Sequence, residues 1–187
     1  MPIANNFMRP ILITLILALV ISCNNNVGKE RDAIKAAYKN KATKLLLSRP
    51  SYSLAYLSDW TIDSSKQMEG VETHFTMNSS NENGMITFFL FDHPKEESEE
   101  LEKHLKAQLK RSIKDGLVKY ITNWGNYKGH GAIIKGKNIV SMQSKLIIFV
   151  SSTADRSFLI TSICADDYED EILPGLNLIE SSFRMKY

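Results

Sequence analysis

Short runs of strand-forming residues, separated by turn-rich pieces, fill most of residues 52–164. Val, Ile, Phe, Tyr and Thr dominate these runs, and such residues favour extended structure. The intervening piece 78–84 (NSSNENG) is rich in turn formers and predicts a hairpin loop. Short connections of this kind favour antiparallel pairing. The predicted strands are residues 52–57, 71–77, 85–91, 118–124, 131–135, 146–151 and 157–164.

An amphipathic pattern over residues 94–115 interrupts the strands and predicts a helix. Acidic residues soon after Pro94 and basic residues near the end of the segment complement the helix dipole. Gly116 is the predicted stop. The apolar stripe of this helix consists of Leu101, Leu105, Leu109 and Ile113.

Residues 167–183 carry a second amphipathic pattern, in which Pro174-Gly175 predicts a kink or a later start. The acidic residues 166–171 fit the beginning of a helix better than a calcium loop, whose alternating spacing and glycine they lack. Strands, a helix, more strands and a terminal helix together predict an α+β fold, an antiparallel sheet covered by helices. The apolar face of the terminal helix is Ile172, Leu176, Ile179 and Phe183.

The N-terminal residues predict export and lipid attachment. The apolar residues 11–21 (ILITLILALVI) follow Arg9 and have about half the length of a membrane-spanning helix, as a signal segment does. Residues 20–23 (VISC) resemble the lipobox of bacterial lipoproteins, in which the cysteine is acylated and freed by cleavage. This resemblance implies a signal peptide over residues 1–22 and palmitate or a related acyl chain on Cys23. An ordinary secretory signal with an incidental cysteine is the alternative.

Acyl chains on Cys23 would hold the protein on a membrane, because each buried methylene contributes about 0.8 kcal/mol. Asn24 stands where aspartate serves as an inner-membrane retention signal in some Gram-negative lipoproteins. The expected location is therefore the bacterial cell envelope, with the outer membrane preferred over the inner one.

Residues 23–49 form a basic segment between the predicted anchor and the strands. Their apolar residues have near-helical spacing, and Pro50 is the predicted end. The segment predicts either a helix that lies on anionic headgroups, or a solvated spacer or helix packed on the domain. Residues 50–187 are then the folded domain. The basic residues are Lys29, Arg31, Lys35, Lys39, Lys41, Lys44 and Arg49.

Without its first 22 residues the 187-residue chain keeps enough length for a single domain with its own core. The whole chain has 23 basic and 21 acidic residues, so no nucleic-acid partner is expected. With Cys23 acylated, Cys164 is the remaining thiol and has no partner for an internal disulfide. Its apolar neighbours predict a buried residue rather than a nucleophile.

Ordered landmarks carry a family resemblance: residues 52–60 (YSLAYLSDW), residues 158–167 (FLITSICADD) and residues 179–183 (IESSF). They resemble the opening strand with its tryptophan, the final strand and the final helix of the PsbP-like family, which includes DcrB-like bacterial lipoproteins. The resemblance covers about residues 50–187 and implies a PsbP-like sandwich. It also implies an assembly, stability or binding role and carries over no catalytic residue.

Residues 124–131 (WGNYKGHG) are the candidate binding segment. Its glycines permit sharp turns, and its larger side chains offer flat and charged contact groups for a peptide, glycan or partner surface. The alternative is a glycine-rich turn between two antiparallel strands with aromatic rings packed over the sheet. The candidate binding residues are Trp124, Tyr127, Lys128 and His130.

No catalytic or metal-binding motif is recognisable. His74, His93, His104 and His130 lack ligand-pair spacing, and the common hydrolase and nucleotide motifs are absent, so neither a metal nor a cofactor is predicted. The sequence therefore predicts a membrane-anchored envelope lipoprotein, not an enzyme, that binds an envelope protein complex or assists its assembly. The alternatives are a carrier of a small apolar ligand between sheet and helix, or an enzyme with an unusual site near His130.

Overall fold

The computed structural model describes residues 42–64, 68, 70–111, 113–138 and 142–186. Chain contacts divide the protein into two compact units, Met1–Ala42 and Thr43–Tyr187, and the elements below belong to the second. Cys23, the predicted signal peptide and most of the predicted basic segment lie outside the described residues. In this part of the chain, no helix has the length and apolar character needed to cross a membrane.

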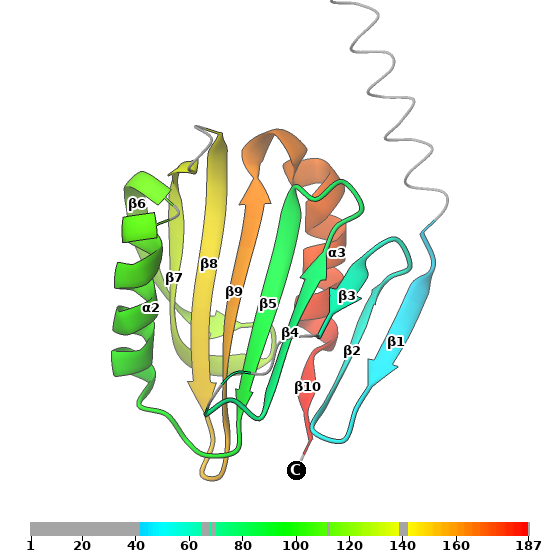
Figure 1. The fold of residues 1–187 in the computed structure, drawn as a ribbon, viewed down its shortest axis with the longest axis vertical. Helices are drawn as coiled ribbons and strands as arrows, with labels where there is room; N and C mark the ends of the chain where they lie inside the picture. The colour runs from blue at the N-terminus through cyan, green and yellow to red at the C-terminus, as the bar shows by residue number, and fades with distance from the viewer. Residues whose placement is uncertain (1–41, 65–67, 69, 112, 139–141, 187) are drawn as a thin grey trace, which may run out of the picture. The chain divides into compact units, whose positions relative to one another are not determined.

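The main sheet has seven strands in the order β3-β4-β5-β9-β8-β7-β6, as Figure 1 shows. Every neighbouring pair is antiparallel, as the sequence predicts. The predicted hairpin loop lies between β4 and β5, where the Ser79 amide donates to the Gly84 carbonyl at 2.8 Å. The strands are β3 (Thr61–Asp63), β4 (Thr73–Asn78), β5 (Gly84–Phe91), β6 (Ile113–Trp124), β7 (Tyr127–Asn138), β8 (Gln143–Ser152) and β9 (Ser157–Ala165).

A smaller antiparallel sheet has the order β1-β2-β10. Its central strand turns Tyr52 and Leu54 into the core of the domain. The Ala55 amide donates to the Ser182 hydroxyl at 2.8 Å and thereby joins this sheet to the end of the last helix. The strands are β1 (Lys44–Ser48), β2 (Tyr52–Leu57) and β10 (Arg184–Met185).

Helix α2 (Glu97–Arg111) covers one face of the main sheet, and α3 (Glu169–Ser182), preceded by the 3₁₀ turn η1 (Asp166–Tyr168), packs against the other. Side chains alternate between the two faces along each strand, so Leu159 joins the α2 side while Phe158 and Ile160 join the α3 side. The predicted α+β fold, an antiparallel sheet covered by helices, is confirmed. The core on the α2 side is Phe91, Leu101, Leu105, Ala132, Ile134, Leu146, Ile148, Val150 and Leu159.

Aromatic rings form the centre of the core on the α3 side. Phe183, which directly follows α3, lies with its ring centroid 4.9 Å from that of Phe88, 5.2 Å from that of Phe158 and 5.8 Å from that of Trp124. These rings come from β5, β9 and β6, so one residue joins the end of the chain to three strands. Burial of each such ring stabilises the fold by about 1.5–3 kcal/mol.

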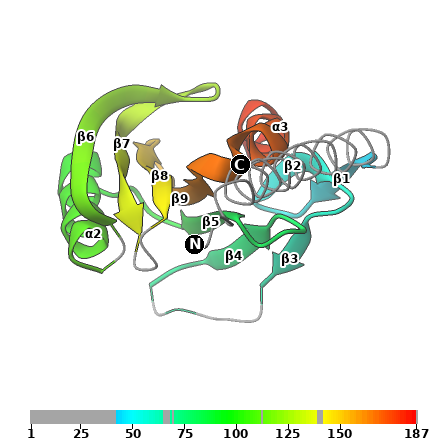
Figure 2. The ribbon, with the colours of Figure 1, turned by 90° about the horizontal axis from the view of Figure 1, so that it is seen from above.

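The β6–β7 ribbon curves strongly, and Figure 2 shows β6 arching from the α2 side toward α3. Its tip reaches α3, where the Gly125 amide donates to the Glu180 carboxylate at 2.8 Å. The Met185 amide donates to the Tyr127 hydroxyl, also at 2.8 Å. Hydrogen bonds therefore join the tip of the ribbon to α3 and to β10.

The first helix is shorter than the sequence predicts. It ends at Arg111, and β6 begins at Ile113, so Ile113 and Gly116 belong to a strand instead of the apolar stripe and the stop. Strand β7 continues to Asn138, and backbone pairing of Ile113 with Asn138 there outweighs the helical pattern. Leu101 and Leu105 are buried as predicted, but Leu109 is 36% exposed.

The predicted boundary between tether and domain is also wrong. Lys44–Ser48 form β1, which pairs with β2 from Lys44 opposite Leu57 to Ser48 opposite Ser53, so residues 44–49 belong to the domain and not to a basic helix. Leu47 packs against the core while Leu46 is 74% exposed. Pairing with β2 satisfies backbone N–H and C=O groups of this short segment.

Pro174 lies inside α3 and does not delay its start, which is at Glu169. The adjacent Gly175 is required by packing. A Cβ atom at this position would lie 2.5 Å from the indole nitrogen of Trp60. The missing side chain lets the helix approach the tryptophan ring closely.

His104 is a partly buried charge site on α2. Its Nε2 lies 3.0 Å from Glu100 Oε1, and Lys103 Nζ lies 3.3 Å from the same oxygen. Burial lowers the pKa of His104 and outweighs the opposing effect of Glu100. Burial by itself raises the pKa of Glu100, but the hydrogen bonds and charges of Lys103 and His104 outweigh it and lower that pKa.

We expect Gly125→Ala to destabilise the domain more than Gly70→Ala. Both glycines have positive φ, 56° and 72°, and a left-handed conformation costs an L-residue about 1–2 kcal/mol. A Cβ atom at position 125 would also lie 2.5 Å from the Glu180 carbonyl oxygen, whereas no atom lies within 4 Å at position 70. Urea unfolding of both variants measures the difference. Equal losses would show that the ribbon tip is not docked on α3.

We expect the free energy of unfolding to fall as the pH is lowered from neutrality. Because the folded pKa of His104 is below its ordinary 6.5, the unfolded chain binds the proton first, and the loss begins as the pH falls through 6.5. The lowered pKa of Glu100 adds a second loss in the same direction below 4.5. Urea midpoints from pH 7.5 to 4 measure both. In His104→Gln the first loss should shrink; an unchanged pH profile would contradict this assignment.

Candidate functional site

Trp124, the first predicted binding residue, is a core residue. It ends β6, is 3% exposed, and its ring lies among those of Phe88, Phe149, Phe158 and Phe183. Only part of the indole reaches a cavity, described below. The ring therefore fixes the ribbon tip to the core.

Tyr127, on the other side of the same turn, is half-buried. Its ring meets that of Phe158 edge-on at 4.8 Å, and its hydroxyl accepts the hydrogen bond from Met185 already described. Both aromatic residues of the predicted segment thus pack over the sheet. This is the arrangement expected for a glycine-rich turn between two antiparallel strands, the alternative to a binding segment.

Lys128 and His130 are exposed and lie on the opposite side of the ribbon, because alternate residues of a strand point to opposite faces. They border an open hollow of about 550 Å³ whose other lining residues are Glu97, Thr122, Asn123, Gly129 and Ser152. The structure therefore separates the four predicted residues: two pack inside, and two face this hollow.

The hollow contains one histidine–carboxylate pair. His130 Nδ1 lies 2.7 Å from Glu97 Oε2, and Glu97 Oε1 accepts from the Ser152 amide at 2.6 Å. The Ser152 hydroxyl donates to the Lys95 carbonyl at 2.7 Å, so its proton is directed away from His130. The pair joins the start of α2 to β7 and β8.

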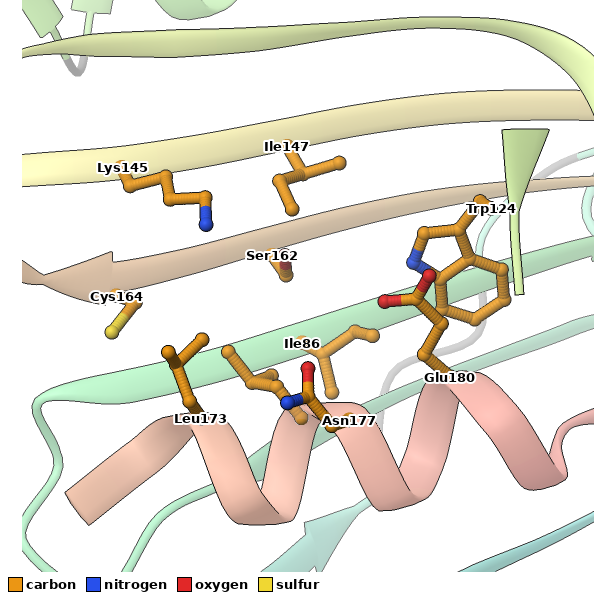
Figure 3. A pocket seen from close by; sticks show the side chains of 10 residues that line it. Ile86, Trp124, Lys145, Ile147, Ser162, Cys164, Leu173, Asn177 and Glu180 are labelled. Atoms are coloured by element: carbon orange, nitrogen blue, oxygen red, sulfur yellow. The ribbon is translucent and has the colours of Figure 1, made fainter. Parts of the chain in front are cut away.

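A second cavity, the α3 slot, lies between α3 and the sheet. It encloses about 80 Å³ and combines an apolar lining with polar groups at its rim. In Figure 3, Lys145, Cys164 and Leu173 lie toward one end of the slot, and Trp124 and Glu180 lie toward the other. The slot is lined by Ile86, Trp124, Lys145, Ile147, Ser162, Cys164, Leu173, Leu176, Asn177 and Glu180.

The charged groups of the slot are held in place. Lys145 Nζ lies 3.6 Å from Glu169 Oε1, and Glu180 accepts the hydrogen bond from the Gly125 amide. Burial, together with the negative charges of Glu169 and Asp166, raises the pKa of the Cys164 thiol to about 11, although Lys145 acts in the opposite direction. Cys164 is therefore a neutral thiol near pH 7, buried as the sequence predicts.

The sequence does not reveal the slot. Its residues come from β5, β6, β8, β9 and α3, and at most four of them, those on α3, fall within one short segment. Lys145 precedes the predicted strand 146–151, and Asn177 and Glu180 lie on what the sequence shows as the polar side of a helix. Register and helix packing bring these residues together.

Among the described residues, no group of three or more His, Cys, Asp or Glu side chains is arranged to hold a metal ion. The acidic residues Asp166, Asp167, Glu169, Asp170 and Glu171 lie at the start of η1 and α3, where the sequence analysis places them. Negative charge there complements the helix dipole.

No protein-family model matches the chain, and no curated protein matches it. Solved structures do share its fold. LpqN of Mycobacterium tuberculosis, described as involved in cell envelope biogenesis, matches with a TM-score of 0.50 and 10% sequence identity over 80% of this chain and 94% of that chain.

Two further structures are similar over much of this chain. A crystal structure from Bacteroides thetaiotaomicron gives a TM-score of 0.48 at 12% identity, covering 79% of this chain and 49% of the other. The solution structure of cyanobacterial PsbP from Synechocystis gives 0.44 at 8% identity, covering 78% and 92%. At sequence identities this low, the matches show similarity of fold alone. The fold shared with LpqN is an antiparallel sheet covered by helices.

Proposed function

We propose that this protein is a lipid-anchored binding or assembly factor of the bacterial cell envelope, and that the α3 slot is its contact site. The observation that carries the proposal is the slot itself, in which an apolar lining meets a rim of fixed polar groups. Ligand-contact sites have this composition.

The size of the slot favours a protein partner. Small-molecule pockets usually measure about 300–1,000 Å³, and an engineered cavity of about 150 Å³ holds benzene. The slot encloses about 80 Å³, which suits one aliphatic side chain. A single buried anchor residue of this kind often contributes much of the binding energy at a protein interface.

The chemistry of the described residues supports a binding role rather than an enzymatic one. The raised pKa of Cys164 keeps its side chain a protonated thiol near neutral pH. A nucleophilic cysteine needs the thiolate form instead. His130 is paired with Glu97, and the nearby Ser152 hydroxyl donates to a backbone carbonyl. Each of these groups has a structural partner in place of a catalytic one.

Attachment to the envelope is supported by the lipobox-like residues 20–23, which place an acylated Cys23 ahead of the domain. The fold shared with LpqN, a protein described as involved in cell envelope biogenesis, agrees with this location. We place the protein on the outer membrane rather than the inner one because Asn24 follows the cysteine.

A carrier of a small apolar ligand is the second candidate function. It is favoured by the apolar side chains of Ile86, Ile147 and Leu176, which line the slot between the sheet and α3. Such a ligand would have to be smaller than a lipid chain, or the helix would have to move.

When the full chain is expressed in a bacterium, we expect its intact mass to show loss of residues 1–22 and addition of acyl chains, and the protein to be in the membrane fraction. Cys23→Ala removes the acyl acceptor and should give no acyl mass. The matched control Cys164→Ala removes the other thiol and should remain acylated. An unacylated wild-type protein in the soluble fraction would refute the anchor.

Filling the slot should block partner binding. With a photo-crosslinking amino acid in place of the exposed Asn177, the full chain should give a discrete crosslink to an envelope protein in cells. Leu173→Phe should lower its yield about tenfold or more, because the slot then loses the burial of one aliphatic side chain. Leu109→Phe, on the exposed side of α2, is the control. Equal yields for both variants would exclude the slot as the contact site.

A further inference from the structure

Strand register places several lysines on one face of the sheet. Residues directly opposite each other in antiparallel strands point to the same face. One cross-strand row is Leu117, Lys135, Lys145 and Cys164, and the next is Lys119, Ile133, Ile147 and Ser162. Cys164, Ser162 and Ile147 line the α3 slot, so both rows belong to the α3 side.

Lys137, two residues beyond Lys135 on β7, points to this side as well. We call Lys119, Lys135, Lys137 and Lys145 the lysine array. It begins at the edge strand β6, crosses β7 and reaches the slot at Lys145, which lines it.

The array carries uncompensated like charge. Lys135 and Lys145 are direct cross-strand partners, whose Cβ atoms lie about 4.5–5.5 Å apart in such pairs, and like charges at this position destabilise a sheet. Within the part of the chain that the structure describes, Lys145 is the one member with an ion pair, to Glu169 at 3.6 Å. Lys119, Lys135 and Lys137 are exposed.

Two acidic side chains of α3 near the array already have partners. Glu169 is engaged with Lys145, and Glu180 accepts from the Gly125 amide at the opposite end of the slot. Three lysines thus remain available beside an apolar opening. Leu117, in the same row as Lys135, is 80% exposed and extends the apolar surface toward the edge of the sheet.

We propose that the lysine array recognises an acidic segment of a partner protein, with one aliphatic side chain of that segment in the α3 slot. The proposal rests on the slot as the contact site and specifies the partner's chemistry. A peptide fits better than an anionic lipid because the slot has the volume of one side chain, not of an acyl chain. A second copy of this domain is disfavoured at the array, since two such arrays would repel each other.

Charge complementarity of this kind accelerates association and makes it depend on salt. The test uses the full-length protein in nanodiscs of neutral lipid. The probe is a fluorescent synthetic peptide with one leucine flanked on both sides by glutamates, and binding is followed by anisotropy. Companion probes replace the glutamates by glutamines or the leucine by glycine, and a short-chain phosphatidylglycerol is added as competitor.

We expect the acidic peptide to bind and both altered peptides to bind more weakly. Lys135→Gln and Lys119→Gln should each weaken binding of the acidic peptide about twofold to fivefold, and their combination should weaken it further. Lys110→Gln, an exposed lysine of α2, is the matched control and should have no effect. Lys135→Gln should also raise the urea midpoint, because it relieves repulsion by Lys145, and this confirms that the variant is folded.

The outcomes separate the two proposals. Equal binding of the glutamine and glutamate peptides, with both blocked by Leu173→Phe, would overturn recognition by the array and leave the slot as the contact site. Peptide binding that ignores Leu173→Phe would exclude the slot. Binding of phosphatidylglycerol alone, dependent on Lys135, would replace the acidic protein segment by an anionic lipid. Failure of every probe to bind would overturn the proposal.

Discussion

The contact of Phe183 with rings from three strands is the interaction on which the rest of this domain depends. Phe183 directly follows α3 and contacts Phe88, Trp124 and Phe158. Those rings determine where the β6–β7 ribbon must end, so the curvature of the ribbon follows from packing at its tip. The ribbon is fixed at its tip and paired to β8 from His130 to Lys137, so it has to curve between these two attachments.

The α3 slot lies where this packing is least complete. Near Trp60, Gly175 lets the helix approach closely, and at its end Phe183 is fully buried. Between these two fixed points the helix presents Asn177 and Glu180 to the slot, whose sheet side includes Lys145. A lysine and an amide cannot be buried without partners, so the helix does not close on the sheet there. The opening is thus a consequence of sequence chemistry at the rim.

Much of the fold is predictable from sequence, because strand-forming runs and amphipathic spacing are local signals. The misses have physical reasons. Strands β3 and β10 have three and two residues, too few for any periodic pattern. Ile113 continues the helical stripe in sequence, yet its backbone pairs with Asn138. The slot is harder to predict, because it depends on helix packing and on register, and a shift of one residue in β8 would turn Lys145 to the α2 side.

The same dependence on register explains why a lysine array remains in a sheet that it destabilises. Nothing in β-strand propensity requires lysine at both Lys135 and Lys145, and an opposite charge at either position would give a favourable cross-strand pair. In the aromatic core on the same face, burial of each ring outweighs an exposed like-charge pair severalfold. Repulsion in the free protein that an acidic partner relieves becomes part of the binding free energy, and a stable core permits this arrangement.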